Sequence, residues 1–170
     1  EYAPVARKIF GLTPEMISYF SKITGVEYPW VKYSQMTAHD YVSGAMENTT
    51  ATLHSDAAQQ DARELVDGNA WESTIAHELF HQWFGDLVTA KSGKHHWLQE
   101  GFATYYALLA EKEVFGEDYF NHQLYRNSLQ LRNAAKTDTI PVMNEKASSL
   151  SFYQKGAWAL HYMREKIGAK

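Results

Sequence analysis

Three residues of the chain have the types and the spacing of a metal site. His77, Glu78 and His81 form an HExxH pattern inside the stretch WESTIAHELFHQWFG. On a helix, residues four positions apart lie one turn above each other on one face, so both imidazoles can reach one metal ion. Glu78 lies one position further round the helix and flanks the site without ligating it. The pattern therefore predicts a zinc site with a carboxylate beside it.

The stretch around this pattern has the signals of a buried helix. Asn69 is a suitable N-cap, Glu72 three residues later completes a capping box, and Gly85 suits the left-handed position after a helix. A broad apolar stripe runs along the stretch, formed by Trp71, Ile75, Ala76, Leu79, Phe80 and Trp83. We therefore expect a rigid, buried helix, which holds ligands in a fixed geometry.

A third ligand is available further along the chain. Glu100 follows His81 with eighteen residues between them, near the start of a second helical stretch, His96–Glu113. The apolar residues of that stretch follow the 3.6-residue period. A short connection and an antiparallel return would bring Glu100 over the face that carries the two histidines. Two histidines and one glutamate are a known ligand set of catalytic zinc, which leaves one position open for water.

These residues belong to longer motifs that resemble a known family. HELFHQWFGDLVT followed by WLQEGFATYY is similar to the aminopeptidase N family of zinc peptidases, which are gluzincins and include the leukotriene hydrolases. The pentapeptide Gly44, Ala45, Met46, Glu47 and Asn48 matches the GAMEN exopeptidase motif of that family. The segment that starts at Tyr153, YQKG, resembles the YxKG segment that carries the family's catalytic tyrosine. The four motifs cover most of the chain.

The resemblance implies a role for each residue at the metal. One zinc ion would be held by His77, His81 and Glu100, and would make water a nucleophile at neutral pH. Glu78 would be the general base that takes the proton of the water and later delivers it to the leaving amine. Tyr153 would donate its hydroxyl to the oxyanion of the tetrahedral intermediate.

The GAMEN motif implies how the substrate is recognised. Glu47 would pair with the free α-ammonium group of a peptide, because an unpaired charge in a closed site is costly. Gly44 would let the substrate backbone approach a strand edge closely, and Ala45 and Met46 would line the first substrate pocket. Asn48 also begins a glycosylation sequon, but its place inside the motif favours coincidence. The expected partners are therefore peptides with a free N-terminus.

Two positions depart from the family pattern. Gln99 stands beside Glu100 where the family usually has asparagine, which would alter the hydrogen bonds around the ligand. His95 and His96 stand where aspartate or aromatic residues are common. They could be alternative ligands, but the polar loop Lys91–Lys94 before them favours histidines that face solvent.

Composition sets limits on the function. With 170 residues, 45% of them apolar, the chain has the size of one globular domain with a sizeable core. The net charge of −4 argues against a nucleic-acid or acidic-membrane partner, and the lack of cysteine excludes a thiolate zinc site. No apolar run is long enough to span a membrane. The resemblance implies that residues 1–170 are one catalytic domain, excised from a longer protein with an N-terminal β-domain and a C-terminal helical domain.

The remaining elements indicate an α+β fold of the thermolysin-like zincin type, with a small sheet followed by a mainly helical part. The sequence predicts helices at residues 13–24, 119–132 and 149–167, strands at 31–42 and 46–54, and a polar loop with a short helix at 55–68.

The resulting hypothesis is a zinc aminopeptidase. Three alternatives remain: a thermolysin-type endopeptidase, against which the GAMEN motif argues; a lipid epoxide hydrolase, an activity that leukotriene hydrolases add to peptidase activity; and a non-catalytic zinc-binding fragment.

Overall fold

A computed structural model describes residues 3–168 of the chain. The α-helices are α1 (Ala6–Phe10), α2 (Thr13–Thr24), α3 (Glu72–Phe80), α4 (Trp97–Phe115), α5 (Glu117–Ala134) and α6 (Gly156–Ile167). The strands are β1 (Ser34–Ala38), β2 (Ala45–Met46) and β3 (Ala51–Ser55). Short 3₁₀ turns lie at Ala3–Val5, Asp56–Ala58, Glu64–Asp67 and Gly93–His95, and a π-helical turn at Ser151–Lys155 leads into α6. No helix in this range is long and apolar enough to cross a membrane.

The sheet is small and mixed. Its strand order is β1-β3-β2, with β1 parallel and β2 antiparallel to β3. Ser34 pairs with Ala51, and Ala45 pairs with His54. Among the described residues β2 pairs only with β3, so its other edge is free to meet an extended peptide. The α+β fold expected from the sequence is confirmed.

The strands are shorter than the sequence predicts. Asp40 and Thr50 have positive φ angles of 53° and 65°, which an extended strand cannot contain. The first turn ends the predicted strand 31–42 soon after β1. The second turn divides the predicted strand 46–54 into β2 and β3. Neither residue is glycine, so the strongest turn signal is missing at both positions in the sequence.

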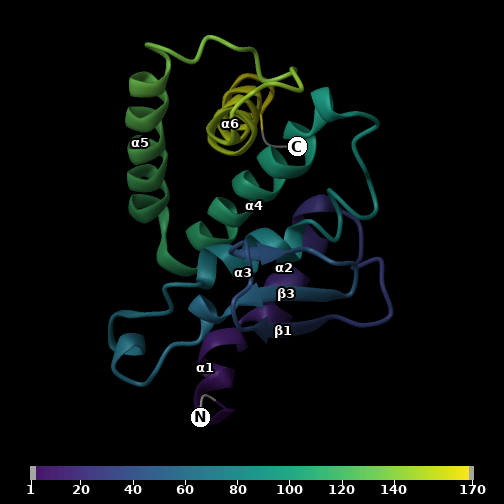
Figure 1. The fold of residues 1–170 in the computed structure, drawn as a ribbon, viewed down its shortest axis with the longest axis vertical. Helices are drawn as coiled ribbons and strands as arrows, with labels where there is room; N and C mark the ends of the chain where they lie inside the picture. Colours follow the sequence, from purple (N-terminus) through teal and green to yellow (C-terminus); the bar gives the residue numbers. More distant parts are fainter. Residues whose placement is uncertain (1–2, 169–170) are drawn as a thin grey trace.

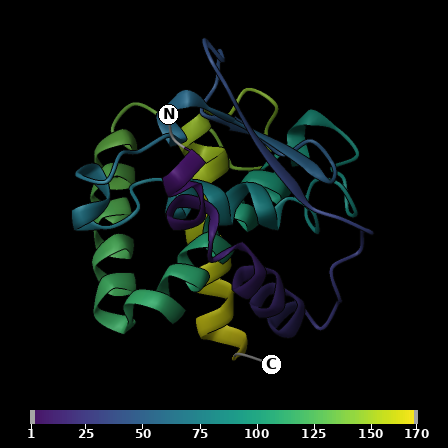
Figure 2. The ribbon, with the colours of Figure 1, turned by 90° about the horizontal axis from the view of Figure 1, so that it is seen from below.

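One apolar core joins the helices α2, α3 and α4. Phe20 of α2 meets Phe80 of α3 edge to face, with ring centroids 5.0 Å apart. Phe80 stacks on Tyr106 of α4 at 4.1 Å. Such aromatic pairs stabilise a core beyond the burial of their area. Figure 2 shows the strands and the α2 helix on opposite sides of these central helices, so the site-bearing helices lie inside the molecule.

A second core lies on the other side of α4. Residues of α4, α5 and α6 form it: Tyr105, Leu108, Leu109, Phe120, Leu124, Ala157 and Leu160. Figure 1 shows α4 running diagonally between the sheet-bearing part and the α5 and α6 helices. Because both sides of α4 are covered, its position is fixed by packing from two directions.

The α3 helix ends earlier than the sequence predicts. The predicted capping box is wrong: the helix begins at Glu72 with Trp71 at its N-cap position and no side-chain cap. Asn69 lies two residues earlier, where its side chain accepts from the Trp71 amide at 3.0 Å and donates to the Glu72 carboxylate at 2.9 Å. Its last residue is Phe80, and the following segment to Gly85 forms tight turns instead of helix. The Gly85 amide bonds to the Val88 carbonyl at 3.0 Å, which closes a loop instead of a helix cap.

His54 is a buried histidine held in one neutral form. Its Nδ1 accepts from the Trp71 indole at 3.1 Å, so its Nε2 carries the proton and donates to Gln35 at 3.0 Å. Burial lowers the pKa of His54 from 6.5 to about 4. A second proton would have to bind to Nδ1, where it would replace the hydrogen bond from the Trp71 indole with a contact between two N–H groups.

This burial predicts a pH dependence of stability. Because the folded-state pKa of His54 lies below the unfolded value, the unfolded chain takes up a proton first as the pH falls. The contribution of neutral His54 to the free energy of unfolding is full above about pH 6.5 and is lost by about pH 4. The free energy of unfolding should fall by on the order of 2–3 kcal/mol over this range. Urea unfolding at several pH values measures it. His54→Asn keeps an acceptor for Trp71 but does not titrate, so this component should vanish; an unchanged slope would contradict the assignment.

Candidate metal centre

Three candidate ligand atoms meet at one point. His77 Nε2 and His81 Nε2 are 3.1 Å apart, and each lies 3.3 Å from Glu100 Oε2. His77 lies on α3, His81 caps its C-terminal end, and Glu100 lies in the first turn of α4. The contact between α3 and α4 therefore brings together all three residues that the sequence singles out.

The spacing of these atoms fits a tetrahedral zinc ion. Bonds of about 2.0–2.2 Å to a tetrahedral ion place neighbouring ligand atoms about 3.3–3.6 Å apart. The three observed distances lie between 3.1 and 3.3 Å, close to that value. Two imidazole nitrogens and one carboxylate oxygen are also the donor types that zinc accepts. Both the donor set and its geometry fit the ion.

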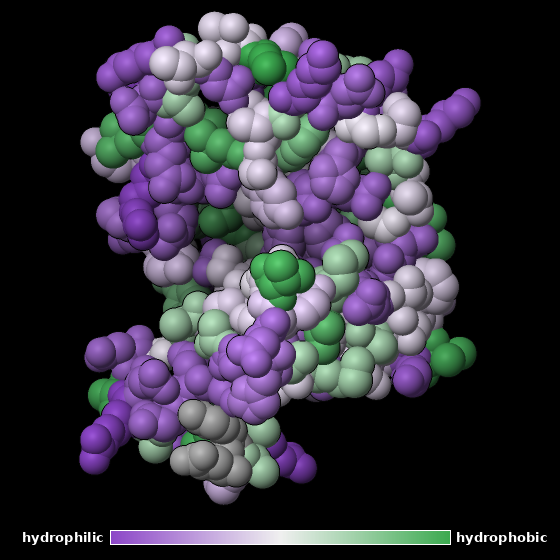
Figure 3. All heavy atoms as spheres, viewed as in Figure 1, coloured by the Kyte–Doolittle hydropathy of each residue, from purple (hydrophilic) through white to green (hydrophobic). Residues whose placement is uncertain are grey.

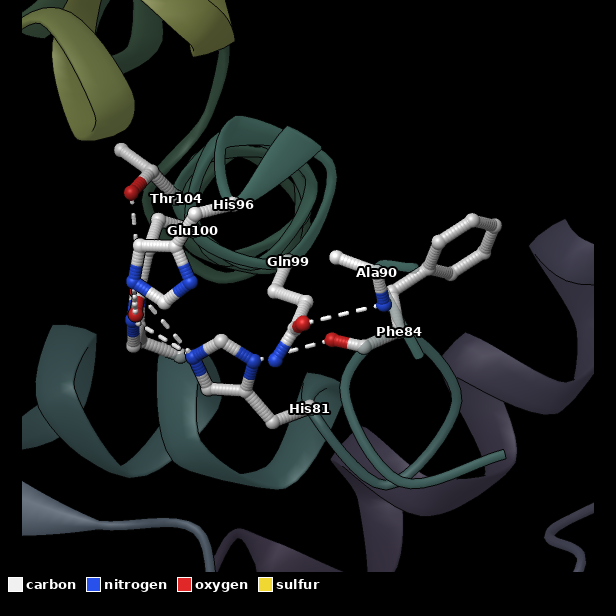
Figure 4. A network of polar contacts seen from close by, with 8 residues as sticks. His81, Phe84, Ala90, His96, Gln99, Glu100 and Thr104 are labelled. Carbon is white, nitrogen blue, oxygen red and sulfur yellow. Dashed lines mark hydrogen bonds and ion pairs between the residues drawn. The ribbon is translucent and has the colours of Figure 1, made fainter. Parts of the chain in front are cut away.

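Hydrogen bonds behind the ligands set their orientation. His81 Nδ1 donates to the Phe84 carbonyl at 2.9 Å, which leaves Nε2 with a lone pair for the metal. Thr104 Oγ1 lies 3.5 Å from Nδ1 of His77, in a longer contact of the same kind. Figure 4 shows these side chains converging from α4 and from the end of α3. A Cβ atom on Gly85 would lie 3.0 Å from His81 Nδ1, so only glycine fits beside this ring.

The two departures from the family pattern take different places. His96 Nε2 lies 3.2 Å from Glu100 Oε1, the oxygen that points away from the other histidines. The His96 side chain is 43% exposed, so it faces solvent on one side and the candidate ligand on the other. This contact was not predicted from the sequence, although the i,i+4 spacing of His96 and Glu100 is a signal for it. Gln99 accepts from the Ala90 amide at 3.1 Å. It therefore braces the preceding loop.

Glu78 is a buried carboxyl group with an unusual proton affinity. Burial raises its pKa to about 8, and the carboxylates of Glu47 and Glu100 add to this effect, while His81 opposes it. Its Oε2 atom is buried without a hydrogen-bond partner among the described residues. A cation on the neighbouring ligands would favour the ionised form. The group is therefore placed to exchange a proton.

Tyr153 lies over the candidate metal ligands. Its ring stacks on that of His77, with centroids 5.5 Å apart and planes inclined by 7°. Burial raises the pKa of its hydroxyl, and the negative charge of Glu100 adds to the effect, so the group stays a proton donor. The sequence does not predict the π-helical turn Ser151–Lys155 that carries it. Such turns add a residue to the helix and often lie at functional sites.

Two glycines let this segment approach α4 closely. A Cβ atom on Gly101 would lie 3.0 Å from Cα of Gly156, and the reverse holds for a Cβ on Gly156. Gly101 directly follows Glu100, and Gly156 ends the turn that carries Tyr153. This backbone contact sets the distance between the tyrosine and the candidate ligands.

An open cleft of about 390 Å³ leads to these groups. Figure 3 shows the molecule hollowed between its helical part and its sheet-bearing part. The cleft is lined by Ser43, Gly44, Ala45, Ser73, Thr74, His77, Glu78, Thr104, Tyr153 and Gln154. Of the GAMEN residues, Gly44 and Ala45 line it, whereas Met46 is 38% exposed and does not. One carboxylate oxygen of Glu47, one of Glu78 and a ring nitrogen of His81 lie within 4.8 Å of one another.

The fold and the three converging side chains define a zincin-type metallopeptidase domain. Residues 9–170 match the Peptidase family M1 domain, and the chain belongs to this family. Aminopeptidase M1 of Arabidopsis thaliana is 31% identical over 166 residues, which cover 91% of this chain and 19% of that protein. The chain thus spans about a fifth of the length of such relatives.

Solved structures of the family have the same fold. The M1 zinc metallopeptidase from Deinococcus radiodurans superposes with a TM-score of 0.72 at 28% identity, covering 93% of this chain and 33% of that one. A mutant of that enzyme, bound to a Tyr-Ser-Ala substrate, gives a TM-score of 0.69 at 30% identity, with the same coverage. Zn²⁺ is the cofactor of this family, and the donor set described above fits it.

The donor set predicts one Zn²⁺ per chain, and Glu100→Gln should weaken its binding. The change removes the anionic ligand itself. The zinc affinity should therefore fall by more than the roughly 10–100-fold loss that is typical when a residue hydrogen-bonded to a ligand is changed. Chelator competition and elemental analysis measure it. Glu111→Gln is the matched control, because Glu111 is a buried carboxyl group on the same helix that bonds to Tyr119 instead. Equal zinc affinity in the two variants would show that Glu100 is not a zinc ligand.

Proposed function

We propose that residues 1–170 form the catalytic domain of a zinc-dependent aminopeptidase, in which His77, His81 and Glu100 hold one Zn²⁺. The convergence of their three donor atoms supports this ligand set. The bound ion supplies the Lewis acidity that polarises a peptide carbonyl and makes water nucleophilic at neutral pH. The residues around it bind the substrate, move protons and stabilise charge.

Glu78 is the general base of this mechanism. It lies on α3 beside the histidines and lines the cleft. Its unpartnered oxygen is available to accept the proton of the attacking water. The same carboxyl group then delivers that proton to the amine nitrogen as the peptide bond breaks. A raised pKa suits both halves of the exchange, because the group must hold the proton between the two steps.

Tyr153 stabilises the charge that develops on the carbonyl oxygen. Its hydroxyl is neutral at physiological pH and its ring is fixed against His77. A donor held in place before the reaction needs no reorganisation, which is the basis of oxyanion stabilisation. The glycine contact between Gly101 and Gly156 keeps this donor at its distance.

The position of Glu47 favours an aminopeptidase over an endopeptidase. Its carboxylate oxygen lies within 4.8 Å of a Glu78 carboxylate oxygen and of a His81 nitrogen. A substrate ammonium group bound there can be separated from the reacting carbonyl by little more than one residue. The free edge of β2 beside the cleft can pair with the extended substrate. The tripeptide complex of the Deinococcus radiodurans relative supports peptides as the substrate class.

Glu78→Gln should abolish turnover and leave zinc bound. The amide cannot accept the water proton, so kcat should fall by about 10²–10⁴-fold. Aminoacyl chromogenic amides report kcat, and elemental analysis reports zinc. Zinc-dependent turnover at the wild-type rate would contradict the assigned base.

The exopeptidase assignment predicts that a blocked N-terminus prevents hydrolysis. An N-acetylated peptide has no charge to pair with Glu47, so the protein should cleave the free peptide and reject the acetylated one. Glu47→Ala should raise KM for the free peptide and reduce the discrimination between the two. Product analysis by mass spectrometry identifies the bond that is cut. Internal cleavage of the acetylated peptide would show an endopeptidase instead.

A further inference from the structure

Gln82 directly follows the candidate ligand His81 and is completely buried. Its side-chain amide makes two short hydrogen bonds to the segment that follows β2. Nε2 donates to the Glu47 carbonyl at 2.9 Å, and Oε1 accepts from the Thr50 amide at 2.9 Å. One side chain next to the metal site therefore clamps both ends of the segment Glu47–Thr50, in which Glu47 directly precedes the turn Asn48–Ala51.

The clamped turn has a strained backbone. The Ala51 amide bonds to the Asn48 carbonyl at 2.8 Å, which closes a β-turn. Thr50 is its third residue and has a φ of 65°, a conformation that β-branched residues rarely adopt. Strain of this kind persists only where the surroundings hold it. The hydrogen bond from the Thr50 amide to Gln82 is one of these restraints.

The clamp itself cannot rotate freely. The backbone N–H of Gln82 donates to the Leu79 carbonyl at 3.1 Å, and the backbone carbonyl of Gln82 accepts from the Trp30 indole at 3.1 Å. The Tyr28 hydroxyl approaches Gln82 Oε1 at 3.4 Å. The backbone and the side chain of Gln82 are thus both fixed. Any change in its position would move the turn and the end of α3 together.

We propose that Gln82 is a positioning residue for recognition of the substrate amine, which rests on the proposed role of Glu47. Through the turn, it fixes the Glu47 carboxylate within 4.8 Å of the His81 nitrogen and the Glu78 carboxylate. The distance between the ammonium site and the metal site then depends on one buried amide. This distance decides that the first peptide bond, and no other, reaches the metal.

The clamp requires one donor and one acceptor at the end of the same side chain. Glutamate at this position would turn an acceptor toward the Glu47 carbonyl. Methionine has a similar length but cannot make either bond. Asparagine is one methylene shorter and cannot reach both groups. Gln82→Met is therefore a change that keeps volume and removes the clamp.

The experiment compares zinc-loaded wild type with Gln82→Met. Two probes bind the zinc through a hydroxamate: L-leucine hydroxamic acid, which has the free amine, and its N-acetyl form, which lacks it. The variant should retain one zinc and bind the acetyl probe as the wild type does. Its affinity for the free-amine probe should fall about tenfold or more, as displaced binding groups do. With aminoacyl amides, KM should rise by a similar factor while kcat changes little.

Two further variants separate positioning from general stability. Thr52→Val removes a buried hydrogen bond of β3, to Tyr33 at 2.8 Å, which involves neither Gln82 nor Glu47. It should lower the thermal midpoint but leave the amine preference unchanged. In a Glu47→Ala background, Gln82→Met should have no further effect on the amine preference, because the two residues act as one unit.

The outcomes are distinct. If the wild type binds both probes equally, the proposed role of Glu47 fails, and the inference fails with it. If the wild type prefers the free amine and Gln82→Met keeps that preference, only the inference is overturned. A loss of zinc, or equal weakening for both probes, would show that Gln82 merely supports the fold.

Discussion

The structure depends on the burial of two imidazoles and a carboxylate at one point between two helices. Glu100 accepts contacts from His77 and His81 at 3.3 Å, and these contacts hold the pKa of its carboxyl group well below the usual range in spite of burial. Such a cluster is costly to bury unless charges of opposite sign meet with good geometry. Glu47, Glu78 and Glu100 place three carboxyl groups around this point. A divalent cation on the same ligand atoms would supply positive charge to balance them. The packing of α3 against α4 must therefore be rigid, and the core around Phe80 and Tyr106 provides this rigidity.

The second constraint is how closely the neighbouring backbone segments approach this cluster. Gly101 and Gly156 bring the Tyr153 segment into backbone contact with α4, and Gly85 lets the chain fold back against His81. In each case a single Cβ atom would occupy the space that the site needs. Glycine normally weakens a helix, so its presence at Gly101 inside α4 is explained by this close approach. The candidate metal ligands, Tyr153 and the loop behind His81 are thus held at their distances by backbone contacts, which tolerate less variation than side-chain contacts.

Features that arise from helix periodicity could be predicted from the sequence, whereas features that arise from local backbone strain could not. The spacing of His77 and His81, and the apolar stripe of α3, result from helix geometry alone, so the two histidines could be placed from the sequence. Glu100 could be proposed from its position on a second helical stretch and from the zinc ligand set, but its contact with α3 depends on tertiary packing, which helix periodicity alone does not fix. The positive φ angles at Asp40 and Thr50 shorten the predicted strands, and neither residue is the glycine that usually marks such a position. The π-helical turn before Gly156 likewise has no signal in the sequence, whereas the contact of His96 with Glu100 follows from their i,i+4 spacing and could have been predicted.

The strained turn at Thr50 connects these observations. Glycine at position 50 would adopt the same φ without strain. The chain has threonine there instead, so the turn keeps a backbone strain that a single substitution would remove. The Thr50 amide is held by Gln82, which α3 and Trp30 hold in turn. The Thr50 carbonyl accepts from the Ser34 amide of β1 at 2.9 Å, so the turn is fixed both from the end of α3 and from the sheet. β2 contains only two residues and pairs with one strand, and it would be a weak support by itself. Gln82, just after the end of α3, therefore also helps to position the edge strand β2 beside the cleft. Movement of the sheet relative to α3 would therefore break the hydrogen bonds between Gln82 and the segment Glu47–Thr50.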